Sequence, residues 1–424
     1  MKVILILPYS SLVTGRDFKV DLFGEGFHIK IAQQIWERTQ KYQLECWRPE
    51  RKLKEAITGE RDGIIYRAFP SFRPTLGFLD RHVWRTSLAT FPPARFALWR
   101  EYSLSMLRQL KKVCQKEEVL IHFCGFFSEF THLLALNCSN VPVVAAHGGG
   151  PPPSYSAWHF ITHLPVSLLE QRAAASADVI LASSRWIYER LSKLYPKANI
   201  KLMFPYGINF EKFKPLAKET ARQALGIPSD KKGLLYVGRY DSVKGVDLSL
   251  KIYQELKKRY DLSLLLVGGL KSDPLYDEAI SSGAIVCEQV PQPELVTYYS
   301  AADIYLFPKF YSSEGIEDLE EWMGIGTAPL ESLACGTPVV GTNLKHFLGT
   351  DDELKRVGKI PSTPDDVAKC IVDVLKHPEL YQDCREIARK YYSWEGVAEQ
   401  LVDIYDNLFE RYYSQGLNKQ GPLI

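Results

Sequence analysis

The stretch from Met323 to Thr342 carries residue types that suit binding of a phosphate beside a hydroxyl-bearing group. Gly324 and Gly326 form a glycine-rich turn before an apolar helical pattern, which leaves backbone N–H groups facing outward at the start of a helix. The helix dipole adds partial positive charge there, and both features favour a phosphate. We therefore expect a phosphate-binding turn, although an ordinary loop before a helix has the same pattern.

A glutamate comes soon after that turn. We expect the helix to begin at Pro329, because proline has no N–H group to leave unpaired in a first helical position, and to end before Gly336. This start places Glu331 two residues inside the helix, where its carboxylate accepts hydrogen bonds from neutral hydroxyls. A phosphate-binding turn beside a hydroxyl acceptor suits a nucleotide that carries a sugar. The alternative is a solvated first-turn glutamate, and both interpretations remain open at this point.

Two basic residues come after another candidate strand. Residues 234–238 form an apolar run of strand length that ends in Gly238, and Arg239 comes directly after it. Lys244 is five residues further on, just before Gly245 and a helical pattern. Two cations at the end of a buried strand, one of them before a helix start, can hold a diphosphate with directional donors and charge.

Two strand ends in the first half are further candidates. The apolar run 141–146 ends in His147, which places an imidazole where open α/β folds bind ligands. We expect His147 to bond to a sugar hydroxyl or to orient an acceptor, with a purely structural histidine as the alternative. Gly24 and Gly26 come after the apolar run 2–7 and precede a helical pattern. They suit either a phosphate or sugar contact or a tight turn.

The elements that must position these residues alternate between strands and helices. Continuous apolar runs of strand length are typical of strands buried on both faces of a parallel sheet. The alternation predicts an α/β fold, and the length of 424 residues predicts two domains. It restarts at Leu216, which places the boundary near 207–217, and residues 365–413 read as helical. The expected strands are 2–7, 119–127, 141–146, 178–182, 201–205, 234–238, 262–269, 285–290, 302–307 and 339–340.

The charge is unevenly distributed along the chain. The composition, 46% apolar and 24% charged, is ordinary for a soluble globular protein, and the net charge is +2. Residues 1–200 hold 26 Lys and Arg against 17 Asp and Glu, whereas residues 201–424 hold 26 against 33. The basic first half favours an anionic partner, such as a membrane surface or an acidic lipid.

The basic excess is strongest over residues 67–112. This window holds nine Lys and Arg against two acidic residues, interleaved with seven Phe and Trp. Such a segment can lie on an anionic membrane interface, which predicts a peripheral membrane protein. In the alternative the aromatic residues are core and the arginines are solvated. Nucleic acid is not expected as a partner, because the chain is near neutral overall and no nucleic-acid-binding module is recognisable.

Cysteine spacing and hydropathy indicate the compartment. The eight cysteines are scattered without any CxxC pair, and several lie in apolar runs. This pattern predicts reduced, packed thiols in a cytoplasmic protein. The apolar N-terminal run is too short for a signal peptide, and no window approaches the roughly 20 apolar residues of a membrane span. No cluster of ligand-type residues has metal-binding spacing, so we expect neither a metal nor a cofactor.

Several of these segments together resemble family-4 retaining glycosyltransferases of GT-B architecture. Tyr236-Val237-Gly238-Arg239 with Lys244-Gly245 is similar to one family motif, and the next apolar run, 265–269, to the family's next strand. Residues 298–303, Tyr-Tyr-Ser-Ala-Ala-Asp, are similar to a family helix end, and residues 329–340 to the signature helix of the family. The resemblance covers nearly the whole chain and is strongest over 234–342.

The resemblance implies two facing, doubly wound Rossmann-like domains with the active site in a deep cleft between them. Residues 1–210 would form the acceptor-side domain and residues 211–388 the nucleotide-sugar-binding domain. Residues 389–424 would cross back as a helix that packs on the first domain. The implied activity is that of a retaining glycosyltransferase, a hexosyltransferase, that moves a sugar from a nucleotide-sugar donor to a hydroxyl acceptor. That acceptor is a lipid-linked molecule, a growing glycan or a small molecule.

The resemblance also implies roles for the residues of this sequence that match the family's motifs. Arg239 and Lys244 would bind the diphosphate and stabilise its charge as it leaves, and His147 is the third catalytic candidate. Glu331 would accept the ribose hydroxyls. The departing phosphate itself would deprotonate the acceptor hydroxyl, since no carboxylate occupies a nucleophile position. The remaining donor-binding candidates are Gly24, Gly26, Gly238, Gly326, Thr327, Ala328, Pro329 and Leu330.

The sequence departs from the family at one position near the donor sugar. The family usually has a second glutamate eight residues before the ribose glutamate, and Met323 occupies that position here. Acidic residues lie just upstream, and either Glu314 or Glu321 would serve instead, or a neutral side chain is tolerated at this position. The departure also motivates a second hypothesis, a catalytically weakened nucleotide-sugar-binding or regulatory protein with the same fold.

Overall fold

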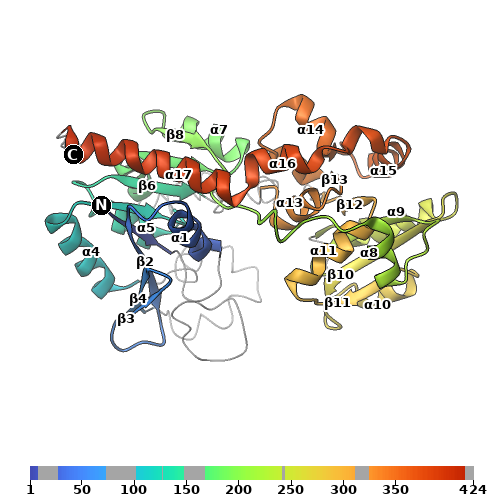
Figure 1. The fold of residues 1–424 in the computed structure, drawn as a ribbon, viewed down its shortest axis with the longest axis horizontal. Coiled ribbons are helices and arrows are strands. Elements are labelled where there is room, and N and C mark those ends of the chain that lie inside the picture. The colour runs from blue at the N-terminus through green and yellow to red at the C-terminus, as the bar shows by residue number, and fades with distance from the viewer. Residues whose placement is uncertain are drawn as a thin grey trace. The chain divides into compact units, whose positions relative to one another are not determined.

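The structure is a computed structural model that describes residues 1–7, 27–72, 102–126, 128–147, 168–240, 244–310 and 324–415. The chain divides into two compact units (Figure 1). Unit 1 comprises Met1–Tyr206 together with Val397–Ile424, and unit 2 comprises Gly207–Gly396. Gly24, Gly26, Met323 and the central part of the basic window, residues 73–101, lie outside the described residues.

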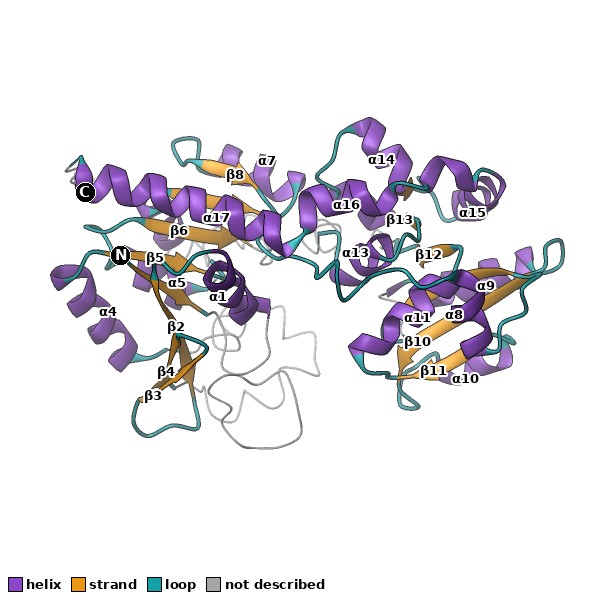
Figure 2. Cartoon of the chain, in the orientation of Figure 1, coloured by secondary structure: helices purple, strands orange, loops and turns teal. Residues whose placement is uncertain are grey.

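Unit 1 is built on an eight-stranded sheet, within the residues described (Figure 2). Its strands run in the order β3-β4-β2-β1-β5-β6-β7-β8, and all neighbours are parallel except the β3–β4 hairpin. The order reverses between β1 and β5, so the crevice at their carboxyl ends is a topological switch point. The strands are β1 (Lys2–Ile6), β2 (Gln43–Glu50), β3 (Ile57–Arg61), β4 (Ile64–Pro70), β5 (Val119–Phe123), β6 (Val143–His147), β7 (Val179–Ala182) and β8 (Ile200–Leu202).

Three helices of unit 1 begin at serine caps where the polypeptide leaves a strand or loop. Ser103, Ser128 and Ser184 each accept a hydrogen bond from a backbone N–H of the first turn, which satisfies a donor that lacks a helical partner. The helices are α1 (Phe27–Arg38), α4 (Leu104–Lys116), α5 (Glu129–Leu136), α7 (Arg185–Leu194) and most of α17 (Trp394–Phe409).

Helix α17 is anchored to unit 1 by buried tyrosines. The hydroxyl of Tyr405 lies 2.5 Å from Nδ1 of His122 on β5, and both side chains are buried. Tyr42, before β2, donates to Asp406 at 2.5 Å. These contacts join residues more than 280 positions apart, so the C-terminal helix is part of the unit 1 core.

Unit 2 contains a six-stranded parallel sheet within the described residues, in the order β11-β10-β9-β12-β13-β14. In chain order this is 3-2-1-4-5-6, the arrangement of doubly wound dinucleotide-binding folds. The switch point, where such folds bind ligands, lies between β9 and β12. The strands are β9 (Lys232–Val237), β10 (Leu262–Gly269), β11 (Ile285–Glu288), β12 (Ile304–Phe307), β13 (Val339–Gly341) and β14 (Gly358–Lys359).

Helices lie along this sheet and bury its apolar strands. Helices α9 and α15 share one hydrophobic cluster with β9, β10 and β12, and α13 packs against β12, β13 and α16. The helices of unit 2 are α8 (Lys218–Leu225), α9 (Val246–Leu256), α10 (Tyr276–Ser281), α11 (Leu295–Ala301), α13 (Thr327–Ala334), α14 (Asp351–Val357), α15 (Asp366–Lys376) and α16 (Cys384–Tyr392), with 3₁₀ turns at Gln292–Glu294, Thr342–His346 and Pro378–Tyr381.

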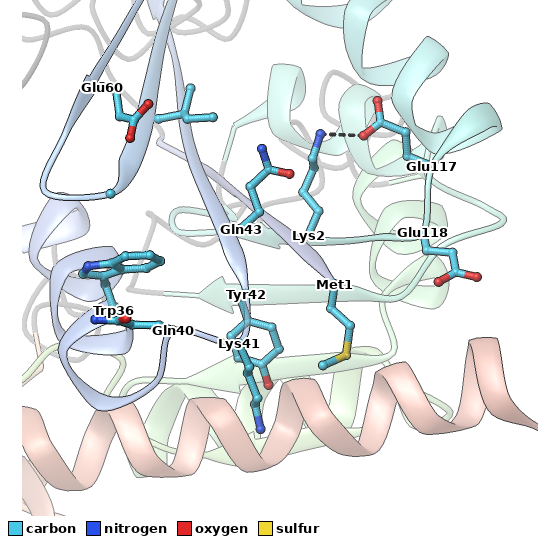
Figure 3. A pocket seen from close by; sticks show the side chains of 12 residues that line it. Met1, Lys2, Trp36, Gln40, Lys41, Tyr42, Gln43, Glu60, Glu117 and Glu118 are labelled. Carbon is cyan, nitrogen blue, oxygen red and sulfur yellow. Dashed lines mark hydrogen bonds and ion pairs between the residues drawn. The ribbon is translucent and has the colours of Figure 1, made fainter.

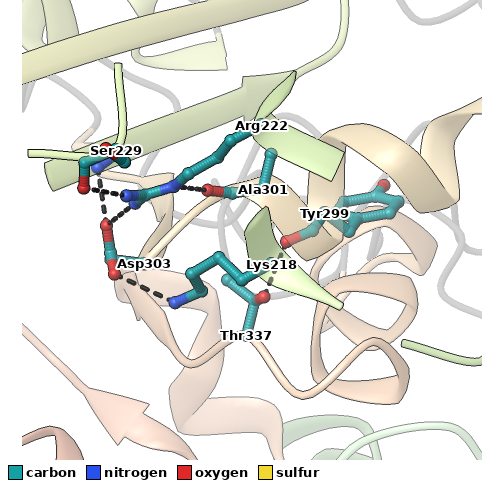
Figure 4. A network of polar contacts seen from close by, with 8 residues as sticks. Lys218, Arg222, Ser229, Tyr299, Ala301, Asp303 and Thr337 are labelled. Carbon is teal, nitrogen blue, oxygen red and sulfur yellow. Dashed lines mark hydrogen bonds and ion pairs between the residues drawn. The ribbon is translucent and has the colours of Figure 1, made fainter. Parts of the chain in front are cut away.

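A polar network joins α8 to the amino ends of β9 and β12 (Figure 4). Asp303 accepts from Arg222 at 2.6 Å, from Lys218 at 3.0 Å and from the backbone N–H of Gly233 at 2.7 Å. Arg222 also donates to the carbonyls of Ala301 and of Ser229. This network lies at the end of the sheet opposite the switch point, so it supports the fold of unit 2.

The predicted α/β class, with parallel sheets in both halves, is confirmed, and each expected strand is present with its ends shifted by at most four residues. One predicted boundary is wrong: α13 begins at Thr327, not at Pro329. All eight cysteines are free thiols. In the described part of the chain, no helix is long and apolar enough to cross a membrane.

Candidate functional site

The carboxyl end of β9 turns sharply at Gly238 and exposes Arg239. Gly238 has φ +152°, and a Cβ there would lie 2.7 Å from the hydroxyl of Tyr236, so a side chain at this position would have to displace that hydroxyl. Tyr236 in turn donates to the carbonyl of Arg239 at 2.8 Å. The backbone N–H groups of Leu270 and Tyr240 lower the pKa of Asp273, with a smaller contribution from the charge of Arg239. The arginine is therefore exposed at the switch point and near a carboxylate.

Lys244 and Gly245 are held against the loop after β12. Gly245 is buried, caps α9 with φ +77°, and lies so close to this loop that a Cβ would be 2.4 Å from the carbonyl oxygen of Pro308. Pro308 is the residue directly after β12, so the loops after β9 and β12 meet at the switch point. Lys244 is half-buried beside this contact. Arg239 and Lys244 thus both belong to the loop at the site that the topology defines.

We expect substitution of Gly245 by alanine to disturb this contact. Gly336 has the same φ, +77°, but a Cβ there meets nothing within 4 Å, so Gly336→Ala is a matched control. The control should lose only about 1 kcal/mol through its left-handed backbone. Gly245→Ala should lose about 2–4 kcal/mol, because overpacking adds to that cost. Urea unfolding of the two variants measures the difference, and equal losses would show that the Pro308 contact is unimportant.

Helix α13 presents its amino terminus after a turn with two left-handed glycines. Gly324 has φ +62° and Gly326 has φ +79°, a conformation that favours glycine. Because the helix begins at Thr327, Pro329 is its third residue, which still belongs to the first turn whose N–H groups lack helical acceptors. Thr327 and Ala328 supply such N–H groups, and Leu330 is buried in the core behind them. The corrected start places Glu331 in the second turn.

Glu331 is buried and hydrogen-bonded. Its side chain is 5% exposed, so it is not the solvated first-turn glutamate that the sequence left open. One carboxylate oxygen, Oε1, accepts from the amide of Gln292 at 2.8 Å, and Oε2 accepts from the hydroxyl of Tyr299 at 3.0 Å. Each of the two carboxylate oxygens is therefore held by a side chain of the same unit.

Tyr305 connects Glu331 to the end of β9. Its hydroxyl donates to the carbonyl of Val237 at 3.4 Å, two residues before Arg239. Burial, and then the charge of Glu331, raise the pKa of Tyr305. Because the charge of Glu331 acts on the Tyr305 hydroxyl, which bonds to the end of β9, the Glu331 carboxylate lies near the switch point that also carries the two basic residues.

Sequence reasoning missed residues that fix these loops. Asn343 is buried and donates to the carbonyl of Ile325, between the two glycines of the α13 turn. Thr342 donates to the carbonyl of Lys309 at 2.7 Å, and Lys309 is a buried lysine directly after Pro308. Asn343 directly follows the stretch 323–342 that the sequence singled out, and this proximity was the available signal.

In unit 1, His147 lies at the carboxyl end of β6. Burial, and then the charge of Arg190, lower its pKa to about 4, so the imidazole is neutral at pH 7. Its Nδ1 is buried and makes no hydrogen bond within the described residues. His132 on α5 is also buried, and burial, then His147, lower its pKa to about 3. His132 was not predicted, although it lies within the first turns of the helix after β5.

A cavity of about 650 Å³ occurs in unit 1 (Figure 3). It lies by the amino ends of β1 and β2 and is lined by Lys2, Trp36, Tyr42, Glu60 and Glu117 among others. None of the predicted site residues lines it. In the described residues, no group of three or more His, Cys, Asp or Glu side chains is arranged to hold a metal ion.

The fold is that of GT-B glycosyltransferases. The whole chain superimposes on sucrose-phosphate synthase from Thermosynechococcus elongatus with a TM-score of 0.64 and 20% identity, covering 97% of this chain and 99% of the other. The Alr3699/HepE protein of Anabaena, solved with UDP, gives a TM-score of 0.63 at 12% identity, with 96% and 100% covered. At these identities the likeness establishes the architecture.

The second unit also matches a family by sequence. Residues 217–391 match the model of the family Glycosyl transferases group 1, which confirms the resemblance there. Among curated relatives, a D-inositol 3-phosphate glycosyltransferase of Corynebacterium urealyticum is 30% identical over 57% of this chain and 59% of its own length. A D-inositol 3-phosphate glycosyltransferase of Saccharomonospora viridis is 28% identical over 56% of this chain and 57% of its own length. The chain thus spans less than two thirds of the length of these relatives.

Proposed function

We propose that this protein is a retaining glycosyltransferase that moves a hexosyl group from a nucleoside diphosphate sugar to a hydroxyl acceptor. The observation that carries the proposal is the arrangement at the switch point of unit 2. There Gly245, next to Lys244, packs against the loop after β12. The hydroxyl of Tyr305 donates to the end of β9 and lies within the electrostatic influence of buried Glu331. Two cations beside a buried hydroxyl acceptor match the charges and hydroxyls of a nucleoside diphosphate.

Each side chain has a distinct part in this proposal. Cleavage of the sugar–phosphate bond builds negative charge on the departing diphosphate, and Arg239, Lys244 and the first-turn N–H groups of α13 stabilise it. Glu331 accepts the ribose hydroxyls, and Gly238 allows close approach of the ligand. The departing phosphate deprotonates the acceptor hydroxyl, and neutral His147 orients that acceptor. No metal or cofactor is assigned to the reaction.

Incubation with radiolabelled nucleotide sugars tests the proposal. UDP-glucose is the first donor, because a solved relative of the same fold, Anabaena Alr3699/HepE, was crystallised with it. D-inositol 3-phosphate, after which the curated relatives are named, is the first acceptor. Donors with other bases and sugars come next, with polyol phosphate, glycan and polyprenyl phosphate acceptors. Transfer or donor hydrolysis supports the enzyme, whereas binding without turnover across the panel supports the weakened, regulatory alternative that Met323 motivates.

We expect Glu331→Gln to weaken nucleotide binding about tenfold while the protein stays folded. The amide keeps one acceptor oxygen and presents a donor, so one charged hydrogen bond to the ribose is lost. Calorimetric titration with the nucleoside diphosphate measures the change. Glu255→Gln removes an exposed carboxylate from α9, away from Glu331 and its partners, and is the matched control. Unchanged affinity in Glu331→Gln would remove this residue from the ribose site.

The membrane partner and the cytoplasmic location remain proposals. In the basic window, Phe69 is buried against Trp47 and Arg67 pairs with Glu45 at 2.9 Å, so these two residues serve the fold. Phe72, in contrast, is 49% exposed. Most of the window lies in 73–101, outside the described residues. Co-sedimentation with anionic but not neutral vesicles would support a peripheral membrane protein with a lipid-linked acceptor, and indifference to both would favour a soluble acceptor.

A further inference from the structure

The two donors to Glu331 come from one continuous segment of the chain. Gln292 lies in the 3₁₀ turn that immediately precedes α11, and Tyr299 lies one to two turns later on α11. Gln292 is exposed, whereas Tyr299 is completely buried. The carboxylate is therefore held from its solvent side by an amide and from its core side by a phenol.

The phenol is a permanent donor. Burial, and then the charge of Glu331, raise the pKa of Tyr299 well above its usual value, so the hydroxyl remains protonated across the physiological range. Its ring packs edge-on against Phe213, with 6.2 Å between the centroids, and its carbonyl accepts from Thr337 at 2.7 Å. The position of the hydroxyl is thus fixed by contacts at both ends of the residue.

The amide is also held from behind. Lys212 donates to the side-chain amide oxygen of Gln292, Oε1, at 2.9 Å, so the NH₂ group of the same amide faces the carboxylate. This contact determines which end of the amide is the donor, because an ammonium group can only donate. The positive charge of Lys212 also polarises the amide toward Glu331.

Lys212 and Phe213 belong to the first segment of unit 2, which is itself tied to α13. Arg385 on α16 donates to the carbonyls of Phe210 and Phe213 at 2.9 and 2.7 Å, and also to the carbonyl of Ala334 at the end of α13. The helix that carries Glu331 and the segment that supports both of its partners are therefore fixed to one guanidinium group.

We propose that Tyr299 and Gln292 are positioning residues that orient the Glu331 carboxylate toward a ribose diol, with Lys212 orienting Gln292. The proposal rests on the proposed function, in which Glu331 accepts ribose hydroxyls. Each oxygen of the carboxylate accepts one hydrogen bond from one of these two side chains, so the pair sets the direction in which the carboxylate points. The same geometry makes these two residues determinants of selectivity for ribonucleotides over 2′-deoxyribonucleotides.

The ratio of affinities for a ribonucleotide and its 2′-deoxy form tests this role. UDP, GDP and ADP are titrated calorimetrically against the full-length protein with their 2′-deoxy counterparts, and the tightest-binding base is used throughout. We expect the wild type to prefer the ribose form and Glu331→Gln to lose that preference. Tyr299→Phe and Gln292→Ala should each reduce the preference about fivefold, since each removes one hydrogen bond to a charged group.

Matched variants separate positioning from general damage. Tyr298→Phe makes the same change on the adjacent residue of α11 and should keep the wild-type ratio. Gln292 is exposed, so its variant remains informative even where Tyr299→Phe lowers stability. Suppose that Glu331→Gln loses the preference for the ribose form, whereas Tyr299→Phe and Gln292→Ala both keep the wild-type ratio of affinities. That result would overturn the positioning role and leave the ribose assignment of Glu331 intact. A wild type without preference, or a Glu331→Gln protein that keeps it, would overturn the ribose assignment and the inference together.

Discussion

Arg239→Ala and Lys244→Ala should each lower turnover about 100-fold with a melting temperature close to that of the parent protein. Preorganised donors that face developing charge contribute about 3 kcal/mol each to transition-state stabilisation. Arg239 is exposed and Lys244 half-buried, so neither side chain supports the core. Initial rates at saturating donor, together with thermal melts of the same samples, measure both quantities.

Charge-conserving and distant variants complete this test. Lys251→Ala removes an exposed cation from α9, outside the switch point, and should have wild-type turnover. Lys244→Arg should recover part of the activity, because it restores charge without the original geometry. Turnover within twofold of the wild type in Arg239→Ala or Lys244→Ala would exclude that residue from the diphosphate site.

The positions of these cations were predictable because parallel strands impose simple rules. A buried parallel strand is a short continuous apolar run, and the residues just beyond its carboxyl end lie at the ligand-binding edge of the sheet. Arg239 after β9 and His147 at the end of β6 were found in this way. The pairing order, which brings the loops after β9 and β12 together, came only from the structure.

Strands with buried charges were not predictable by the same rules. Strand β2, Gln43–Glu50, contains three buried charged residues and no apolar run, so it was not recognised. One of these, Glu45, accepts from the indole of Trp47 at 2.7 Å and pairs with Lys2 and Arg67 from the neighbouring strands. Its partners are 43 and 22 positions away, so a local pattern does not contain the information.

The environment of Glu331 illustrates the same limit at the site. Its place after a glycine turn identified it as a candidate, but its burial depends on Tyr299 and Gln292, 32 and 39 positions earlier. The predicted helix start was wrong because proline is compatible with any position of the first turn, not only the first residue. Thr327, which precedes it, is a residue type that favours the cap just outside a helix, so its pattern did not mark it as a helical residue.

Asp303→Ala should destabilise unit 2 by about 3–5 kcal/mol, the largest effect that we expect on stability. The substitution leaves Arg222, whose side chain is 8% exposed, as an uncompensated buried charge, and breaking such a pair is strongly destabilising. It also removes the acceptor of the Gly233 N–H at the start of β9. Equilibrium urea unfolding, monitored by circular dichroism, measures the loss.

Two further variants distinguish a buried pair from surface charge in this network. Lys218 is 42% exposed, so Lys218→Ala should change stability by less than about 1 kcal/mol although it contacts the same carboxylate. The double variant Arg222→Met with Asp303→Leu should recover part of the loss, because apolar side chains can replace a buried ion pair without leaving a charge. Equal losses in Lys218→Ala and Asp303→Ala would show that Arg222 is solvated, and that the strength of the network does not come from burial.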